Sequence, residues 1–244
     1  MPPPPPPRIF EPIFTNSPAL IPNLTASGET AETRKHCSEL TEARTDQVIC
    51  ERCNAQWISP PRFINFVDVP TTSVVPYSSD VSSVVLKAKE DGNRVARRLI
   101  AQALYEAVDF ILIRNKNQPF VLVPIPSSRE AIRQRGESFL HPILKNVNEI
   151  AAVHGSNWEW KEVLIHKKRV RDQAGLNSRE RSQNLQGVFA VREGVAEERP
   201  IILIDDVITT GSTLKNAILA FNERKMTVLG AATACASAHQ FLIR

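Results

Sequence analysis

The chain has 244 residues, of which 42% are hydrophobic and 23% are charged, and its formal net charge is +4. This length allows one substantial domain with an appendage, and the composition is ordinary for a soluble globular protein. No run approaches the roughly 18 apolar residues of a membrane helix, and the proline-rich start does not resemble a secretory signal. Four cysteines in a chain of this length do not indicate a disulfide scaffold. We therefore expect a cytoplasmic protein without a membrane segment.

The N-terminal part is predicted to hold little regular structure. Nine of the eighteen prolines lie in the first 22 residues, and six of them are consecutive. Such a run favours a polyproline II conformation over a packed element. We expect a disordered tail over 1–33, a short cysteine-containing segment with a linker over 34–72, and the main domain over 73–244.

From Ser73 onward, short apolar runs alternate with helical patterns. A proline closes the apolar run at 120–125, as expected where a strand buried on both faces ends. Asn93 is a candidate N-cap ahead of apolar residues at helical spacing. The predicted strands cover 73–77, 120–125, 163–165, 188–191, 201–204 and 227–236, and the predicted helices cover 93–113, 139–150 and 214–221. Strands that alternate with crossover helices predict an α/β fold with a doubly wound, mostly parallel sheet.

A basic segment lies between His166 and Arg181. It holds six lysines and arginines against two acidic residues, so it alone accounts for a charge of +4. A local basic loop indicates an anionic ligand, which could be a nucleic acid or a phosphorylated metabolite. A solvated surface loop would have the same composition.

Two carboxylates and several small hydroxyl residues follow the strand predicted at 201–204. The segment 205–213 reads DDVITTGST and leads into a predicted helix. Backbone amides at a helix start bind anions, and Gly211 lets the backbone approach a ligand closely. Four hydroxyl side chains would add hydrogen bonds to phosphate oxygens: Thr209, Thr210, Ser212 and Thr213.

The adjacent Asp205 and Asp206 suit the vicinal hydroxyls of a sugar. They would also stabilise the positive charge that develops at an anomeric carbon during glycosyl transfer. A helix cap would explain one aspartate, but not two carboxylates together with four hydroxyls. The segment therefore predicts a site for a ribose phosphate, with Asp205 and Asp206 as its catalytic pair.

The segment 201–213 resembles the signature with which type I phosphoribosyltransferases bind 5-phosphoribosyl-1-pyrophosphate (PRPP). Three further segments resemble the ComF (GntX-like) branch of that superfamily: a lysine-containing segment at 86–92, a Pro-x-Pro strand exit with a downstream Arg-Gly at 124–136, and a Gln-x-x-Leu block at 173–189. The order and spacing agree from about Tyr77 to Ala236. The resemblance implies a type I phosphoribosyltransferase fold and a PRPP ligand that binds together with Mg²⁺.

The resemblance also implies further substrate-binding residues. The turn at 126–129 would bind the pyrophosphate group, whose charge Lys89, Arg133 and Arg135 would neutralise. Gln173 would donate a hydrogen bond to the ligand from the basic loop, which would correspond to a mobile hood. Each of the three cations, taken alone, is explained as well by an exposed position on a helix.

Two functions remain open at this stage. The first is an enzyme that transfers a phosphoribosyl group to a nitrogenous acceptor and releases pyrophosphate. The second is a non-catalytic PRPP-binding or nucleotide-binding accessory protein in DNA uptake, with DNA or DNA-uptake proteins as partners. A fold and a phosphate site do not establish turnover. The acceptor and the oligomeric state are not predicted.

The cysteines raise the question of zinc. ComF proteins often carry an N-terminal zinc module of two Cys-x-x-Cys pairs, and Cys50 and Cys53 form one such pair. Cys37 remains from the other pair, whose first position is Arg34. Tetrahedral zinc needs four ligands, and His36 is awkwardly adjacent to Cys37. We therefore expect neither zinc nor any other metal bound by the protein alone.

Overall fold

The computed structural model describes residues 49, 51–57, 59–64, 68–167 and 187–237. The expected tail, Gln173 and most of the basic segment lie outside these residues. The predicted division at 33 and 72 stays a prediction. Among the helices of the described part, none combines the length and hydrophobicity that a membrane crossing requires.

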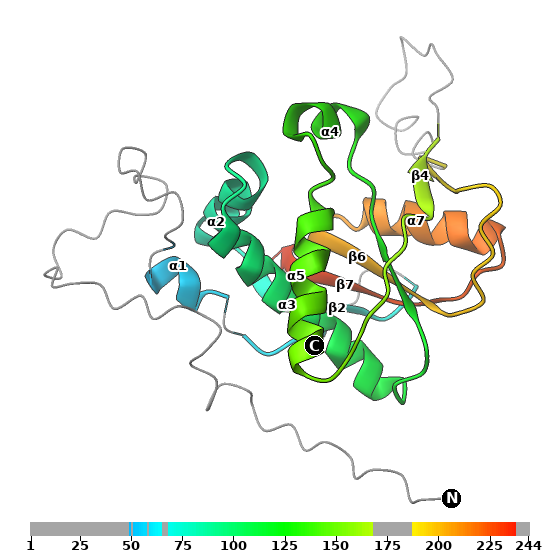
Figure 1. The fold of residues 1–244 in the computed structure, drawn as a ribbon, viewed down its shortest axis with the longest axis horizontal. Coiled ribbons are helices and arrows are strands. Elements are labelled where there is room, and N and C mark those ends of the chain that lie inside the picture. Colours follow the sequence, from blue (N-terminus) through cyan, green and yellow to red (C-terminus); the bar gives the residue numbers. More distant parts are fainter. Residues whose placement is uncertain (1–48, 50, 58, 65–67, 168–186, 238–244) are drawn as a thin grey trace, which may run out of the picture. The chain divides into compact units, whose positions relative to one another are not determined.

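A five-stranded sheet forms the centre of the described domain (Figure 1). Only β1 is antiparallel to its neighbour among the pairs of this sheet. In spatial order the strands are β1 (Arg62–Ile64), β2 (Thr71–Tyr77), β7 (Val228–Ser237), β6 (Ile201–Ile208) and β3 (Val121–Pro124). The predicted α/β fold with a mostly parallel sheet is confirmed.

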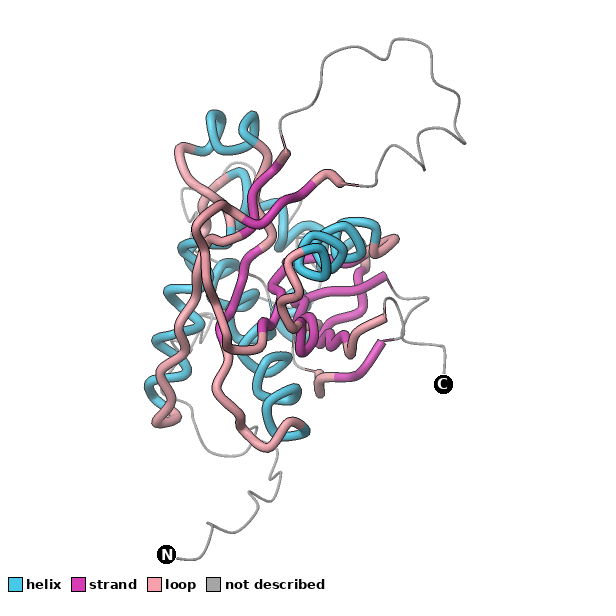
Figure 2. The backbone as a smooth tube through the Cα atoms, turned by 90° about the vertical axis from the view of Figure 1, so that its right-hand side faces the viewer, coloured by secondary structure: helices cyan, strands magenta, loops and turns pink. Residues whose placement is uncertain are grey.

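Helices cover both faces of this sheet, as Figure 2 shows from the side. The first face packs against α2 (Ser79–Glu90), α3 (Arg94–Arg114) and α5 (Leu140–Val153), and the second against α7 (Ser212–Glu223). Successive residues of a strand point to opposite faces, so Ile202 and Ile204 of β6 join the first core and Ile201 and Leu203 join the second. This double burial explains why β6 is apolar without alternation. Two short helices complete the described part: α1 (Glu51–Ala55) and α4 (Arg129–Arg135).

The two short strands that flank the basic segment form a hairpin of their own. β4 (Leu164–His166) and β5 (Phe189–Val191) pair with each other in antiparallel fashion and lie apart from the main sheet. The preceding segment extends the main sheet instead. Leu122 of β3 donates a backbone hydrogen bond to Glu159 (2.9 Å) and accepts one from Lys161 (2.9 Å).

Four described elements were not predicted from the sequence (α1, β1, α2 and α4), and β6 is longer than predicted. Helix α2 is not among the predicted helices, although Ser78 caps it by accepting a hydrogen bond from the Val81 amide (3.3 Å). Its valines and serines have weak helix propensity, and its helical state depends on the burial of one face. Strand β6 was predicted to end at residue 204 but continues to Ile208, because β7 pairs with it as far as Ala236. Asp205 and Asp206 therefore belong to the strand and not to the loop that follows it.

Helix α3 is the central packing element of the first face and offers a direct test of the fold. Leu104 is fully buried on this helix, whereas Ile113 is 43% exposed. Leu104→Ala removes core contacts and leaves a cavity, so we expect it to lower the free energy of unfolding by about 2–5 kcal/mol. Ile113→Ala should lower it by less than about 1 kcal/mol, because a half-exposed side chain buries less apolar area. Urea denaturation measures both values, and equal losses would contradict the packing of α3.

Candidate functional site

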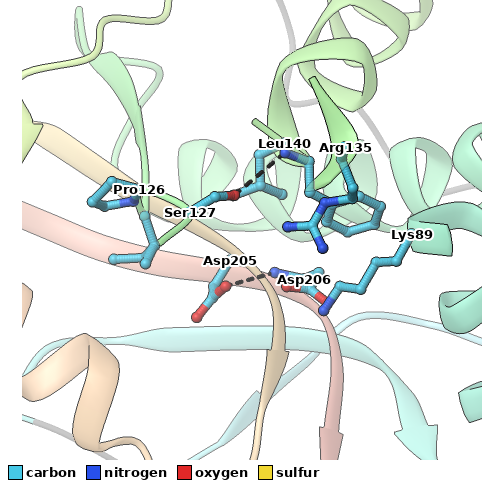
Figure 3. A pocket seen from close by; sticks show the side chains of 9 residues that line it. Lys89, Pro126, Ser127, Arg135, Leu140, Asp205 and Asp206 are labelled. Atoms are coloured by element: carbon cyan, nitrogen blue, oxygen red, sulfur yellow. Dashed lines mark hydrogen bonds and ion pairs between the residues drawn. The ribbon is translucent and has the colours of Figure 1, made fainter. Parts of the chain in front are cut away.

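A pocket lies at the carboxyl ends of β3 and β6, the edge at which open α/β sheets bind ligands. Its walls come from α2, the turn after β3, α4, the start of α5 and the end of β6 (Figure 3). It brings together four of the residues predicted from the sequence. The polar side chains that line it are Lys89, Ser127, Arg135, Asp205 and Asp206.

An ion pair in this pocket joins α2 to β6. Lys89 Nζ lies 2.6 Å from Asp206 Oδ2, and the ammonium also lies 5.1 Å from the centre of the Phe139 ring. The Asp206 side chain is 12% exposed and that of Lys89 is 29% exposed, so this ion pair is largely removed from water. Lys89, predicted to face a pyrophosphate, therefore contacts a carboxylate of the protein itself.

Asp205 lies in a different environment from its neighbour. Its Oδ1 accepts a hydrogen bond from the backbone N–H of Asp206 (3.0 Å). Burial of the carboxylate, reinforced by the negative charge of Asp206, raises the pKa of Asp205 well above its ordinary range, and the Lys89 ammonium opposes this shift only in part. The two carboxylates thus line the same pocket but have different contact partners.

The turn after β3 and helix α4 form the opposite wall. Ser127 Oγ accepts a hydrogen bond from the Phe139 amide (3.3 Å) and shares another with Ser138 Oγ (3.3 Å). Arg135 extends from α4 into the pocket, with Nη1 3.9 Å from a carboxylate oxygen of Glu90. Among the described residues, no acceptor takes a hydrogen bond from the buried Nε of Arg135. This wall therefore supplies a cation and a hydroxyl to the same space.

The start of α7 lies directly after the carboxylates along the chain. Gly211 has a φ of +71°, a conformation that a residue with a Cβ rarely adopts, and it turns the chain into the helix. Thr210 Oγ1 and Ser212 Oγ share a hydrogen bond of 3.0 Å. The threonines at 209, 210 and 213 are exposed and Ser212 is half-buried. These hydroxyls are not among the residues that line the pocket.

One further predicted residue of the described part is not brought to the pocket by the structure. Arg133 is exposed on α4 and is absent from the pocket lining. Gln173 lies outside the described residues.

His166 contributes to the site in a way that the sequence did not indicate. Its Nε2 donates a hydrogen bond to the Pro126 carbonyl (3.0 Å), and its ring lies 4.9 Å from that of Phe189. His166 therefore connects the β4–β5 hairpin to the turn that lines the pocket. The contact spans 40 positions along the chain, and no local sequence signal marks it.

The cysteines of the described part are buried. Cys53 of α1 packs in the first core together with Trp57, whereas Cys37 and Cys50 lie outside the described residues. Burial raises the pKa of Cys235 on β7, which indicates a thiol that stays protonated. Within the described ranges, no cluster of three or more histidine, cysteine, aspartate or glutamate side chains has the arrangement of a metal site.

The raised pKa of Asp205 predicts a pH-dependent cost to stability. A group whose pKa is raised by folding stabilises the folded state below its unfolded pKa, and this contribution is lost as the pH rises through the folded pKa. We expect Asp205→Asn to melt at a higher temperature than the wild type at about pH 8, with a difference that shrinks toward about pH 4, where aspartate ionises in the unfolded chain. Melting temperatures across this range measure the effect.

The exposed Asp68 provides the matched control for this measurement. Asp68→Asn should show no comparable pH-dependent difference from the wild type. A variant Asp205→Asn that is less stable than the wild type at every pH would contradict the assigned environment.

The comparison with known proteins adds two curated relatives. No family model matches the chain. The chain is 26% identical over 151 residues to Competence protein ComFC of Streptococcus pneumoniae, and the match covers 61% of this chain. It is 29% identical over 141 residues to Competence protein F of Haemophilus influenzae, and this match covers 57% of the chain. The chain spans about 60% of the length of each relative.

One solved structure, that of the allosteric regulatory enzyme of purine biosynthesis, is similar to this chain. The match covers 57% of this chain and 25% of the enzyme's chain. Its TM-score is 0.30 and its sequence identity is 14%, a likeness too low to bear on fold or function. The two curated relatives, in contrast, each match about three-fifths of this chain at 26–29% identity. They support the resemblance of this chain to the ComF family.

Proposed function

We propose that this protein binds PRPP and transfers its phosphoribosyl group to a nitrogenous acceptor with release of pyrophosphate. One observation carries the proposal. Two carboxylates at the end of β6 share a pocket with the cations Lys89 and Arg135, next to the start of α7 along the chain. PRPP is a ribose with a phosphate at one end and a pyrophosphate at the other. Its site needs groups that accept hydrogen bonds from the ribose hydroxyls and groups that donate hydrogen bonds to the phosphates.

Each part of the site has a distinct task in this proposal. Asp205 and Asp206 form the acidic side, which accepts hydrogen bonds from ribose hydroxyls and stabilises the positive charge at the anomeric carbon. The start of α7 and the hydroxyls at 209–213 bind the 5′-phosphate. Lys89, Arg135 and the turn at Ser127 receive the departing pyrophosphate. Arg133 and Gln173 stay predicted contacts of the ligand, on the strength of the family resemblance alone.

Mg²⁺ would enter as the ion that accompanies PRPP. The donor set of the pocket is compatible with this ion, because Mg²⁺ takes one or two carboxylates and otherwise keeps waters and phosphate oxygens. Asp205 is the carboxylate that could contact it, since Asp206 already pairs with Lys89. When bound, the ion would reduce the negative charge of the pyrophosphate group.

A second function is favoured by the names of the relatives. Both are described as competence proteins, so this chain could serve DNA uptake by binding PRPP or a nucleotide without turnover. Its partners would then be DNA or other DNA-uptake proteins. The pocket would act as a ligand sensor in that case, with the same residues in contact with the ligand.

Titration calorimetry with PRPP, with and without Mg²⁺, tests the shared part of both functions. We expect a dissociation constant on the order of micromolar that falls when Mg²⁺ is present. The double variant Asp205→Asn/Asp206→Asn should lose binding, whereas Asp68→Asn should bind like the wild type. A folded wild-type protein that does not bind PRPP would refute the proposal.

A second measurement separates the enzyme from the accessory protein. Pyrophosphate release from PRPP in the presence of a panel of nucleobases would support transfer. Binding of single-stranded DNA that weakens steeply as salt increases, without pyrophosphate release, would support the accessory role instead.

A further inference from the structure

The turn that follows β3 has one backbone group without a partner in the described part of the chain. The Pro126 carbonyl accepts a hydrogen bond from His166 Nε2 of β4 (3.0 Å). The Ser127 hydroxyl accepts one from the Phe139 amide at the start of α5 (3.3 Å). Among the described residues, no acceptor takes a hydrogen bond from the Ser127 backbone N–H, although Ser127 lines the pocket (Figure 3). This N–H is therefore available to a ligand.

The Pro126 carbonyl and the Ser127 N–H belong to the same peptide unit. This unit is planar and trans, so the two groups point in opposite directions. His166 holds the carbonyl toward the β4–β5 hairpin, and the N–H consequently points away from the hairpin. If the unit turned over, the carbonyl oxygen would take the place of the N–H and would repel an anion. The direction of one peptide unit thus decides whether the turn attracts or repels a phosphate group.

His166 is held in place by the hairpin to which it belongs. It lies directly opposite Phe189 in the register of β4 and β5, and the two rings are 4.9 Å apart. The adjacent backbone hydrogen bond of the hairpin, from the Lys167 amide to the Val188 carbonyl, measures 2.8 Å. A carbonyl oxygen only accepts hydrogen bonds, so Nε2 is the ring nitrogen that carries the proton in this contact. The position and the tautomer of the ring are therefore both defined by the fold.

We infer that His166 is a positioning residue for the pyrophosphate end of the substrate. It orients the peptide unit between Pro126 and Ser127 so that the Ser127 N–H, and not the Pro126 carbonyl, faces the pyrophosphate group. The identity of this group rests on the proposed function, whereas the hydrogen bond to the carbonyl rests on geometry alone. His166 is not among the residues that line the pocket, so it acts through the turn and not by contact with the substrate.

The hydrogen bond is tested first in the protein without added ligand. Nitrogen-15 NMR of the histidine rings at about pH 8.5, where histidine is ordinarily neutral, reports which ring nitrogen carries the proton. The His166 signals are identified by their loss in His166→Gln. We expect the Nε2–H tautomer alone. A proton on Nδ1, or rapid exchange between the two tautomers, would overturn the contact.

The role in binding is tested by calorimetry in the presence of Mg²⁺ with two probes, inorganic pyrophosphate and ribose 5-phosphate. His166→Phe retains a ring beside Phe189 but cannot donate a hydrogen bond. It should weaken pyrophosphate binding about tenfold or more, because the peptide unit is no longer held and a hydrogen bond to a charged group is lost. It should change the affinity for ribose 5-phosphate by less than about threefold, because the 5′-phosphate is proposed to bind at the start of α7.

A rescue variant and a matched control separate positioning from a purely structural role. His166→Gln restores a side-chain N–H that can reach the carbonyl, so it should bind pyrophosphate within about threefold of the wild type. His154 is also half-buried and stacks on a ring, that of Tyr105 (5.1 Å), but it lies at the end of α5 far from the pocket. His154→Phe should leave both affinities unchanged.

Three outcomes would overturn the positioning role. They are unchanged pyrophosphate binding in His166→Phe, equal weakening of both probes by this variant, and a glutamine variant that binds as weakly as the phenylalanine variant. If the wild type binds neither pyrophosphate nor PRPP, the proposed function fails and the role of His166 in binding fails with it. The NMR measurement still decides in that case whether His166 holds the Pro126 carbonyl.

Discussion

The pocket depends on a difference in length between the two neighbours of β6. β3 pairs with β6 only as far as Ile204, where the Ile125 amide donates the last hydrogen bond (2.8 Å), whereas β7 continues to Ile208. At Asp205 and Asp206, β6 therefore pairs with β7 on one side and has no pairing with β3 on the other. A strand held by one neighbour can present carboxylates at fixed positions without a flexible loop.

The same constraint sets the electrostatics of the site. A carboxylate at the end of a buried strand is partly removed from water, and an ionised group there needs a partner. Asp206 has one in Lys89, whereas burial and the negative charge of Asp206 raise the pKa of Asp205. Burying an ionised group costs free energy. Pockets that bind charged ligands commonly carry this cost, because the groups that bind the ligand lack hydrogen-bond or charge partners without it.

The remaining groups reach the pocket from elements far apart in the chain. Lys89 lies near the end of α2, Arg135 at the end of α4, and the Ser127 turn between β3 and α4. Two further contacts hold these elements together. Arg97 forms an ion pair with Glu137 (3.3 Å), and His166 donates a hydrogen bond to the Pro126 carbonyl (3.0 Å). Positions of single side chains thus depend on the packing of α2, α3 and α5 on one face of the sheet.

The sequence by itself determined the order of the long strands and of helices α3, α5 and α7, because strands buried on both faces and helices with one apolar face leave clear patterns. It also identified the segment 205–213 and the cations at 89 and 135 through local composition. Only the tertiary structure decided that Asp205 and Asp206 lie within a strand, that α2 is a helix, and that Lys89 pairs with Asp206. The length of β6 depends on its pairing with β7, and the Lys89–Asp206 pair joins residues more than 100 positions apart, so no local pattern encodes either outcome.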